Sequence, residues 1–215
     1  MNNRPIIIVQ QQSAFARHAK LLGLSVEEIG STPCNLTSQQ VEQCEALFWA
    51  LSSMCHVFLR NRVMGMLLRV PKDCTRILDF NLQDVAFADK NIIRESLSCS
   101  DMLILEKRDL TTVSQLLGLQ SQSVFDMGFD LMAAFGIKTL ILNHGIHGCH
   151  VFHGNAVSER FGHLNLSSCQ VEEAEGAFAA AFYAASRNSK RLFSECHRMA
   201  LDYLKYFVSS SCGKT

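Results

Sequence analysis

Short apolar segments of strand length alternate with longer segments of helical periodicity along most of this chain, and this alternation limits the folds it can adopt. Continuous apolar runs suit strands buried on both faces, whereas recurrence every three or four residues suits helices. The expected strands are residues 6–9, 56–59, 76–80, 101–105 and 139–142, and the expected helices are residues 38–54, 90–97, 110–117 and 124–135. Such β-α-β-α alternation predicts an α/β fold with a mainly parallel central sheet and helices on both of its faces.

The helix expected over residues 38–54 follows Thr37 and Ser38, either of which can cap its start. Trp49 lies on this segment, where we expect it to be buried or in contact with a partner. The apolar positions at helical spacing are Val41, Cys44, Leu47, Phe48 and Leu51.

Glycines mark the expected ends of elements in the second half of the chain. Gly136 stands where a helix ending at Phe135 would place its left-handed terminal residue. Gly154 and Asn155 predict the turn of a hairpin within residues 149–161. Two helices, over residues 173–186 and 190–208 and joined at Asn188, are expected to close the chain.

The composition fits one folded domain over residues 1–215, because 48% of the residues are hydrophobic and only 3 are prolines. Twenty basic and 20 acidic residues cancel, which excludes a global field for nucleic acid or an anionic membrane. No apolar run approaches the roughly 20 residues that span a bilayer, so we expect no membrane association. Nine cysteines without a C-x-x-C pair predict free, mostly buried thiols in an intracellular reducing compartment, either the cytoplasm or a mitochondrial or plastid matrix.

One segment is locally basic, with Asp73 as its only acidic residue. If its side chains cluster they can contact RNA or an acidic partner, although no aromatic residues are interleaved to stack on bases. A solvated face is the simpler interpretation. The basic residues are Arg60, Arg62, Arg69, Lys72 and Arg76.

Four histidines recur every third residue, at His144, His147, His150 and His153, with Cys149 among them. This pattern invites a zinc interpretation. However, positions 150 and 153 of a strand face opposite sides, so the four imidazoles should not converge. We therefore expect no metal site and packed or exposed histidines.

Several segments together resemble a known family. They are LDFNLQD (residues 78–84), DMLILEKRDL (101–110), the turn at residues 136–139, NHGIHG (143–148) and VEEAEGAFAAAF (171–182). Their order and spacing are similar to those of the PfkB-type, ribokinase-like carbohydrate kinases, in particular the fructokinase branch, over residues 35–208. The resemblance implies a three-layer α/β/α fold and an ancestry of ATP-dependent phosphoryl transfer to a sugar hydroxyl.

The same resemblance implies that the catalytic base is missing. The family carries a D-T-x-G-A-G-D run before an apolar helix, and aligning that helix with residues 178–182 places Glu173, Ala174, Glu175 and Gly176 on the tetrad G-A-G-D. The base position is then Gly176, which has no side chain to accept a proton. The two glycines of the anion hole become glutamates, whose charges oppose a triphosphate by roughly 4 kcal/mol per contact at about 4 Å.

The carboxylates of this segment have other interpretations. Glu172, Glu173 and Glu175 suit the start of a helix, where each stabilises it by about 0.3–1 kcal/mol. Alternatively, Glu175 replaces the missing base, although adjacent helix positions point about 100° apart.

Other positions also differ from the family's motifs. The N-x-x-E element corresponds to residues 106–109, which lack the asparagine and end in Asp109, while Asp79 and Asn81 retain two residues of the D-P-N segment. The nucleotide loop T-x-G-x-x-G corresponds to Asn143, Gly145 and Gly148, without the threonine. Fold geometry or residual nucleotide contact explains these glycines.

Residues 1–34 show no counterpart of the family's first strands, substrate lid or sugar-binding glycine pair. A fold without its lid leaves sheet edges and apolar surface to be covered by protein partners. Our leading hypothesis is a catalytically inactive relative without a cofactor, acting as a structural or interaction subunit of a larger assembly, including an organellar one. The alternatives are a diverged carbohydrate or nucleoside kinase that uses ATP and magnesium, and a nucleotide-sensing regulator.

Overall fold

The structure, a computed structural model, describes residues 4–9, 13–30, 36–82, 89–159, 168–188 and 190–212. Their strands form one eight-stranded sheet of order β2-β1-β3-β4-β5-β6-β7-β8. The pairs from β2 to β6 are parallel, and β7 and β8 are antiparallel. The strands are β1 Ile6–Val9, β2 Val26–Glu28, β3 Ala46–Ala50, β4 Thr75–Phe80, β5 Met102–Glu106, β6 Thr139–Asn143, β7 Cys149–His153 and β8 Ala156–Glu159.

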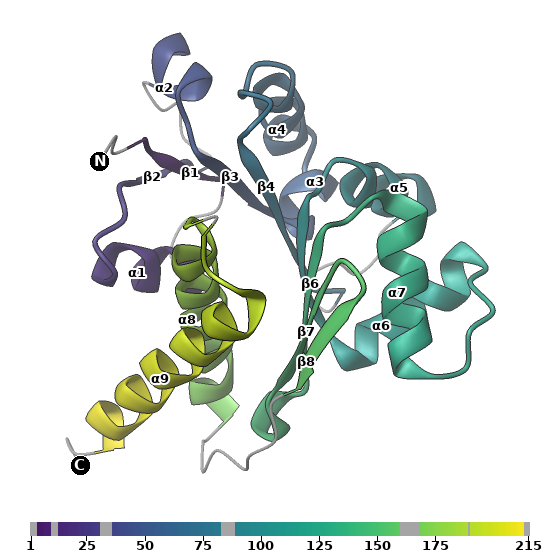
Figure 1. Cartoon of the computed structure of the whole chain (residues 1–215). Coiled ribbons are helices and arrows are strands. Elements are labelled where there is room, and N and C mark those ends of the chain that lie inside the picture. The colour runs from purple at the N-terminus through teal and green to yellow at the C-terminus, as the bar shows by residue number, and fades with distance from the viewer. Residues whose placement is uncertain are drawn as a thin grey trace.

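Helices cover both faces of this sheet, as Figure 1 shows, with α1, α8 and α9 on one side and α5, α6 and α7 on the other. The α-helices are α1 Ala14–Leu21, α2 Ser38–Glu42, α3 Leu51–Cys55, α4 Val57–Leu67, α5 Lys90–Ser98, α6 Lys107–Leu117, α7 Val124–Phe135, α8 Ser168–Ser186 and α9 Phe193–Cys212, and a 3-10 turn covers Gly145–His147. The predicted α/β class and the mainly parallel sheet are confirmed. Among the described residues no helix is both long and apolar enough to cross a membrane.

Two separate apolar cores result from the alternation of side chains along each strand. In β3, Leu47 and Trp49 face the core beneath α3 to α7, while Phe48 faces the core beneath α1, α8 and α9. In β4, Leu78 faces the core beneath α3 to α7, and Ile77 faces the core beneath α1, α8 and α9. The strands are therefore buried on both faces, which explains their continuous apolar runs.

The helix expected over residues 38–54 is wrong. Thr37 caps the short α2 through a capping box with Gln40, but the chain then enters β3. All five residues of β3 are buried, and a continuous apolar run matches helical spacing as well as it matches a strand. The strand expected over residues 56–59 is also wrong, because these residues form the start of α4, where Val57 and Phe58 are exposed.

The other predicted elements between residues 76 and 159 are confirmed within one to three residues. Gly136 ends α7 in the left-handed conformation, with φ of 69°. Gly154 has φ of 56° in the turn between β7 and β8. Phe161, at the end of the expected hairpin, lies outside the described residues.

The N-terminal segment supplies two strands of the main sheet, of which β1 was predicted and β2 was not. Ile6 to Val9 of β1, expected as a strand, lie between β2 and β3 and are fully buried. The expectation that residues 1–34 lack the first strands of the fold is therefore wrong. Every described strand belongs to the one sheet, so none of them forms a separate lid.

The burial of Trp49 gives a direct test of the β3 placement. Trp49 is the only tryptophan of the chain and its side chain is fully buried. We expect its fluorescence to resist quenching by iodide in the native protein and to become quenchable in urea. Efficient quenching of the native protein would contradict a central strand at residues 46–50.

Candidate functional site

A cavity of about 870 Å³ opens at the carboxyl ends of β4, β5 and β6, between these strands and the start of α1. This is the edge of an open α/β sheet at which ligands bind. The cavity brings together residues of the loop at 143–148 and of the segment 171–182, the two places that the sequence indicated. Its polar lining consists of Ser13, Asp79, Asn81, Glu106, Arg108, Asn143, His144, Glu172 and Glu175.

Helix α8 begins at Ser168, earlier than the start expected near Glu173. No acidic residue lies in its first turn, so the proposed role of Glu172, Glu173 and Glu175 at a helix N-terminus is wrong. Only the first four N–H groups of a helix lack a partner within it. The backbone N–H groups of residues 173–176 therefore bond within the helix and are not available to a phosphate. Glutamates at positions 173 and 175 favour this helical backbone more than glycines would.

Gly176 is in direct contact with α1. A Cβ added at Gly176 would lie 2.3 Å from the Cβ of Ala14 and 2.8 Å from both the carbonyl carbon of Ala14 and the backbone nitrogen of Phe15. Ser13 fixes this part of the chain, because its hydroxyl accepts a hydrogen bond from Ala16 N at 3.1 Å and caps α1. The position assigned to the catalytic base is thus filled by another helix.

Glu173 joins three helices. It is paired with Arg17, and its Oε1 lies 3.0 Å from Nε2 of the fully buried His18. The Nδ1 of His18 lies 2.9 Å from the hydroxyl of Tyr203 in α9. The hydrogen bond from Arg17 lowers the pKa of Glu173, and burial lowers the pKa of His18. Glu173 is therefore a structural residue and does not line the cavity.

Glu175 lines the cavity, and the pKa of its carboxyl group is unusually high. Burial, followed by the nearby charges of Glu106 and Asp79, raises its pKa to about 8, although a hydrogen bond with the Gly145 backbone acts in the opposite direction. Most of its carboxyl groups are therefore protonated at pH 7. Arg108, the cation of the cavity lining, donates to both carboxylate oxygens of Glu106, at 2.7 Å and 2.6 Å.

The loop after β6 contains two left-handed glycines, Gly145 with φ of 60° and Gly148 with φ of 100°. His144 N donates to Gly148 O at 2.8 Å and closes the loop around the 3-10 turn. Backbone conformation alone therefore requires both glycines. Asn143 and Gly145 line the cavity, and nucleotide contact through this loop stays a prediction.

Asp109 is the last residue of the segment 106–109, which was compared with the N-x-x-E element of the resembled family. It is buried in α6 and does not line the cavity. Its Oδ2 accepts a hydrogen bond from Leu82 N at 3.0 Å. It fixes the chain after β4.

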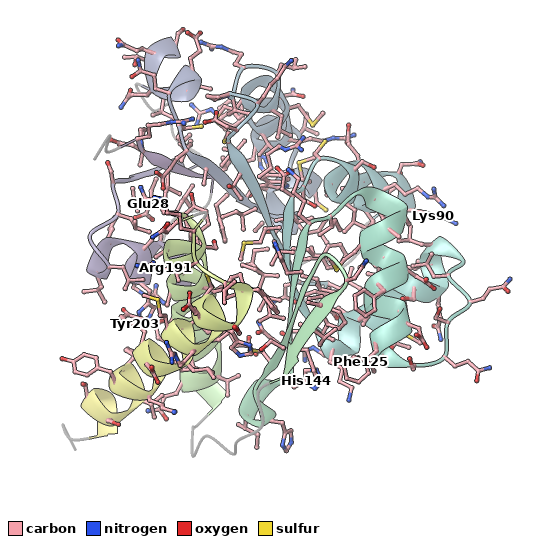
Figure 2. All side chains as sticks on the ribbon, in the orientation of Figure 1. Glu28, Lys90, Phe125, His144, Arg191 and Tyr203 are labelled. Atoms are coloured by element: carbon pink, nitrogen blue, oxygen red, sulfur yellow. The ribbon has the colours of Figure 1, made fainter. Side chains whose placement is uncertain are left out.

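Two of the four histidines are neighbours, which their spacing had not indicated. His144 Nε2 lies 2.7 Å from His150 Nδ1, and Phe125 packs edge-on against His150. Figure 2 shows His144 and Phe125 at this end of the sheet. His153 instead contacts Thr139, at 2.9 Å. No group of three metal-ligating side chains occurs among the described residues.

The basic segment is largely ion-paired. Arg60, Arg69 and Arg76 bind Glu95, Glu42 and Asp101, respectively. Arg62 donates to Gly30 O at 3.1 Å and lies over the ring of Phe58. Lys72 lines a smaller cavity at the amino ends of β4, β5 and β6. RNA contact through this segment stays a prediction.

Substitution of Gly176 tests the contact between α1 and α8. Gly176→Ala should lower the free energy of unfolding by about 1–3 kcal/mol, because the added methyl group overlaps the α1 backbone. Gly65→Ala is the matched control. A Cβ at Gly65 of α4 meets nothing within 4 Å, so alanine should stabilise the protein by about 0.5–1 kcal/mol. Urea unfolding measures both, and equal effects would contradict the packing.

The acidity of Glu175 predicts a pH dependence of stability. Between the ordinary carboxyl pKa and about 8 the native state retains a proton that the unfolded state has lost. The free energy of unfolding should therefore fall as the pH rises from about 6.5 to 8, by up to about 1.4 kcal/mol per pH unit. Below about pH 6.5 the lowered pKa values of His18 and His144 act in the opposite direction. Glu175→Gln should remove this slope, and Glu172→Gln, at an exposed neighbour, should keep it. Urea unfolding from pH 5 to pH 9 measures it, and an unchanged slope in Glu175→Gln would place the titrating group elsewhere.

No protein-family model and no curated protein sequence matches the chain. Solved structures do match. Fructokinase from Vibrio cholerae O395 in apo form has a TM-score of 0.67 and 10% identity, over 98% of this chain and 99% of that one. Adenosine kinase from Trypanosoma brucei brucei has a TM-score of 0.64 and 8% identity, over 94% of this chain and 74% of that one.

A third structure, fructokinase with bound ATP from Xylella fastidiosa, has a TM-score of 0.57 and 11% identity, over 93% of this chain and 74% of that one. At such identities the similarity lies in the arrangement of helices and strands. The chain therefore has the ribokinase-like fold of the PfkB carbohydrate kinases.

Proposed function

We propose that this protein is a catalytically inactive relative of sugar and nucleoside kinases that acts as a structural or interaction subunit of a larger assembly. The contact at Gly176 carries the proposal. The family resemblance assigns the base to this position, and α1 leaves no room there for any side chain. A base cannot be regained there without displacing the helix.

The charge of the cavity supports the same proposal. Glu106, Glu172 and Glu175 line it, and Arg108 is committed to Glu106. Each ionised carboxylate at about 4 Å from a phosphate charge opposes binding by roughly 4 kcal/mol near a protein surface. Glu175, which is mostly protonated at pH 7, adds this repulsion only when it ionises. The helical backbone at residues 173–176 has no free N–H groups to offset this repulsion.

Surface features support a protein partner. The edges of the sheet are β2 and β8, and an edge strand can pair with another chain. Val57 and Leu68, at the two ends of α4, are 75% and 86% exposed. The arginines of the basic segment are largely engaged in ion pairs, which favours a protein partner over RNA. A reducing compartment, cytoplasmic or organellar, accords with the free cysteines described at residues 44, 55, 74, 99, 149 and 196.

Glu175 favours one alternative function. A carboxyl group with a pKa of about 8 in a large cavity can act as a general base near neutral pH. Under this alternative the protein is a diverged kinase that binds ATP with magnesium and phosphorylates a sugar or nucleoside, with Glu175 in place of the base lost at Gly176.

Assays of nucleotide binding and turnover separate these functions. We expect no sugar- or nucleoside-dependent consumption of ATP and no micromolar binding of ATP or ADP in calorimetry with magnesium. Substrate-dependent turnover that Glu175→Gln abolishes and Glu172→Gln retains would establish the kinase. Micromolar binding without turnover would instead support a nucleotide-sensing regulator.

The subunit role has its own test. The tagged protein, purified from its native source, should elute as part of a complex larger than its own 24.0 kDa, with a partner in fixed stoichiometry. Elution as a free monomer at native expression levels would contradict the proposal.

A further inference from the structure

The cavity at the carboxyl ends of β4, β5 and β6 is acidic, unlike the anion sites that helix N-termini form in other α/β proteins. Its described lining contains one guanidinium, that of Arg108, and four carboxyl groups, those of Asp79, Glu106, Glu172 and Glu175. Arg108 already binds both oxygens of Glu106. The lining therefore holds more acidic groups than its own cation can neutralise.

The side chain of Asn143 lies in the cavity wall without a hydrogen-bond partner among the residues that the structure describes. Asn143, the last residue of β6, is only 4% exposed and lines the cavity. Its backbone pairs with the neighbouring strands, but its side-chain amide forms no hydrogen bond with any residue that the structure describes. The amide atoms are not fully buried, so they open onto the cavity, where a ligand can reach them.

The inner wall of the cavity is apolar. Phe48, Ile104 and Ala179 line it from β3, β5 and α8, and the ring of Phe15 stacks on that of Phe48 with centroids 4.6 Å apart. Such a wall suits the methylene groups of a ligand, while the carboxyl groups suit a positive end. The aromatic pair can add a cation–π contact.

A bare metal ion fits this cavity poorly. A metal needs several ligand atoms within about 2.0–2.6 Å of one point. Among the described residues no three acidic, histidine or cysteine side chains are placed to provide them. The carboxyl groups are distributed over the wall, which suits an extended cation better than a point charge.

We propose that this cavity binds a small aliphatic amine, with an ammonium group at the carboxylates of Glu106 and Glu175 and with a second polar group at the amide of Asn143. This ligand class goes beyond the proposed subunit role and does not depend on the loss of catalysis.

The pH dependence of ligand binding gives a second measurement, because binding is linked to the ionisation of Glu175. An ammonium group stabilises the ionised form of Glu175, so binding should release a proton below about pH 8 and strengthen as the pH rises from 6 to 8. The charged and titratable groups facing Glu175 are Asp79 from β4, Glu106 from β5, Arg108 from α6, His144 after β6 and Glu172 from α8.

Calorimetry with three small ligands, each with a four-carbon chain, tests the proposal. The probes are 1,4-diaminobutane, the neutral 1,4-butanediol and the dianion succinate. We expect saturable binding of the diamine with one site per chain, binding of the diol at least about tenfold weaker, and no binding of succinate. The diamine affinity should fall with added salt, because the attraction is electrostatic.

Variants locate the binding in the cavity. Glu106→Gln and Glu175→Gln should each weaken diamine binding at least about tenfold, because each removes a carboxylate that faces the ammonium group. Asp202→Asn is the matched control, since it removes an exposed carboxylate of α9 that does not line the cavity. Circular dichroism confirms that each variant is folded.

Four results would overturn the proposal, three of them from the diamine measurements. These three are equal affinity for the diamine and the diol, no diamine binding at millimolar concentration, and diamine binding that Glu106→Gln and Glu175→Gln leave unchanged. Saturable binding of magnesium alone that excludes the diamine would also overturn it. ATP turnover would overturn the proposed function and leave this proposal intact, so the two can fail separately.

Discussion

The close approach of α1 to α8 at Gly176 determines the shape of the candidate site. A glycine at this point allows the Cβ of Ala14 to occupy space that any side chain at position 176 would need. The contact is reinforced from the side by Glu173, which holds Arg17 and His18 of α1 and, through His18, Tyr203 of α9. With α1 fixed in this way, its start forms one wall of the cavity, and the carboxyl ends of β4, β5 and β6 form another.

Electrostatics then decides what the cavity can hold. The typical anion site of an α/β fold combines free N–H groups at a helix start with a low density of negative charge. Here α8 begins before the segment 173–176, so those N–H groups are engaged, and carboxyl groups line the wall instead. Burial and the charges of Glu106 and Asp79 keep Glu175 mostly protonated at neutral pH. The early start of α8 thus leaves this end of the sheet with an acidic cavity and without free helix N–H groups at residues 173–176.

Much of the architecture could be predicted from local patterns. The strands β1, β4, β5 and β6 and the helices α5, α6 and α7 were expected near their observed bounds, because each has a clear apolar period or a capping residue. The prediction failed at residues 38–59, where five consecutive buried residues of β3 have the spacing of a helix as well. It also failed at the start of α8. The glutamates were assigned to the N-terminus of the helix, which favours acidic residues, whereas Glu173 lies in the second turn and is bound there by Arg17 and His18 of α1.

By itself the sequence determined the fold class and the absence of a side chain at Gly176, and it predicted the place of the candidate site at the carboxyl ends of the strands. Each of these depends on residue types and their order along the chain. Only the tertiary structure decided that α1 fills the space beside Gly176, that Glu173 and Glu175 have different roles, and that β1 and β2 complete the sheet. These outcomes depend on contacts between segments that are far apart in the sequence. Arg17 and Glu173 are 156 positions apart, and His18 and Tyr203 are 185 positions apart. Local periodicity carries no information about such pairs, because the free energy that fixes them comes from packing and charge across the folded chain.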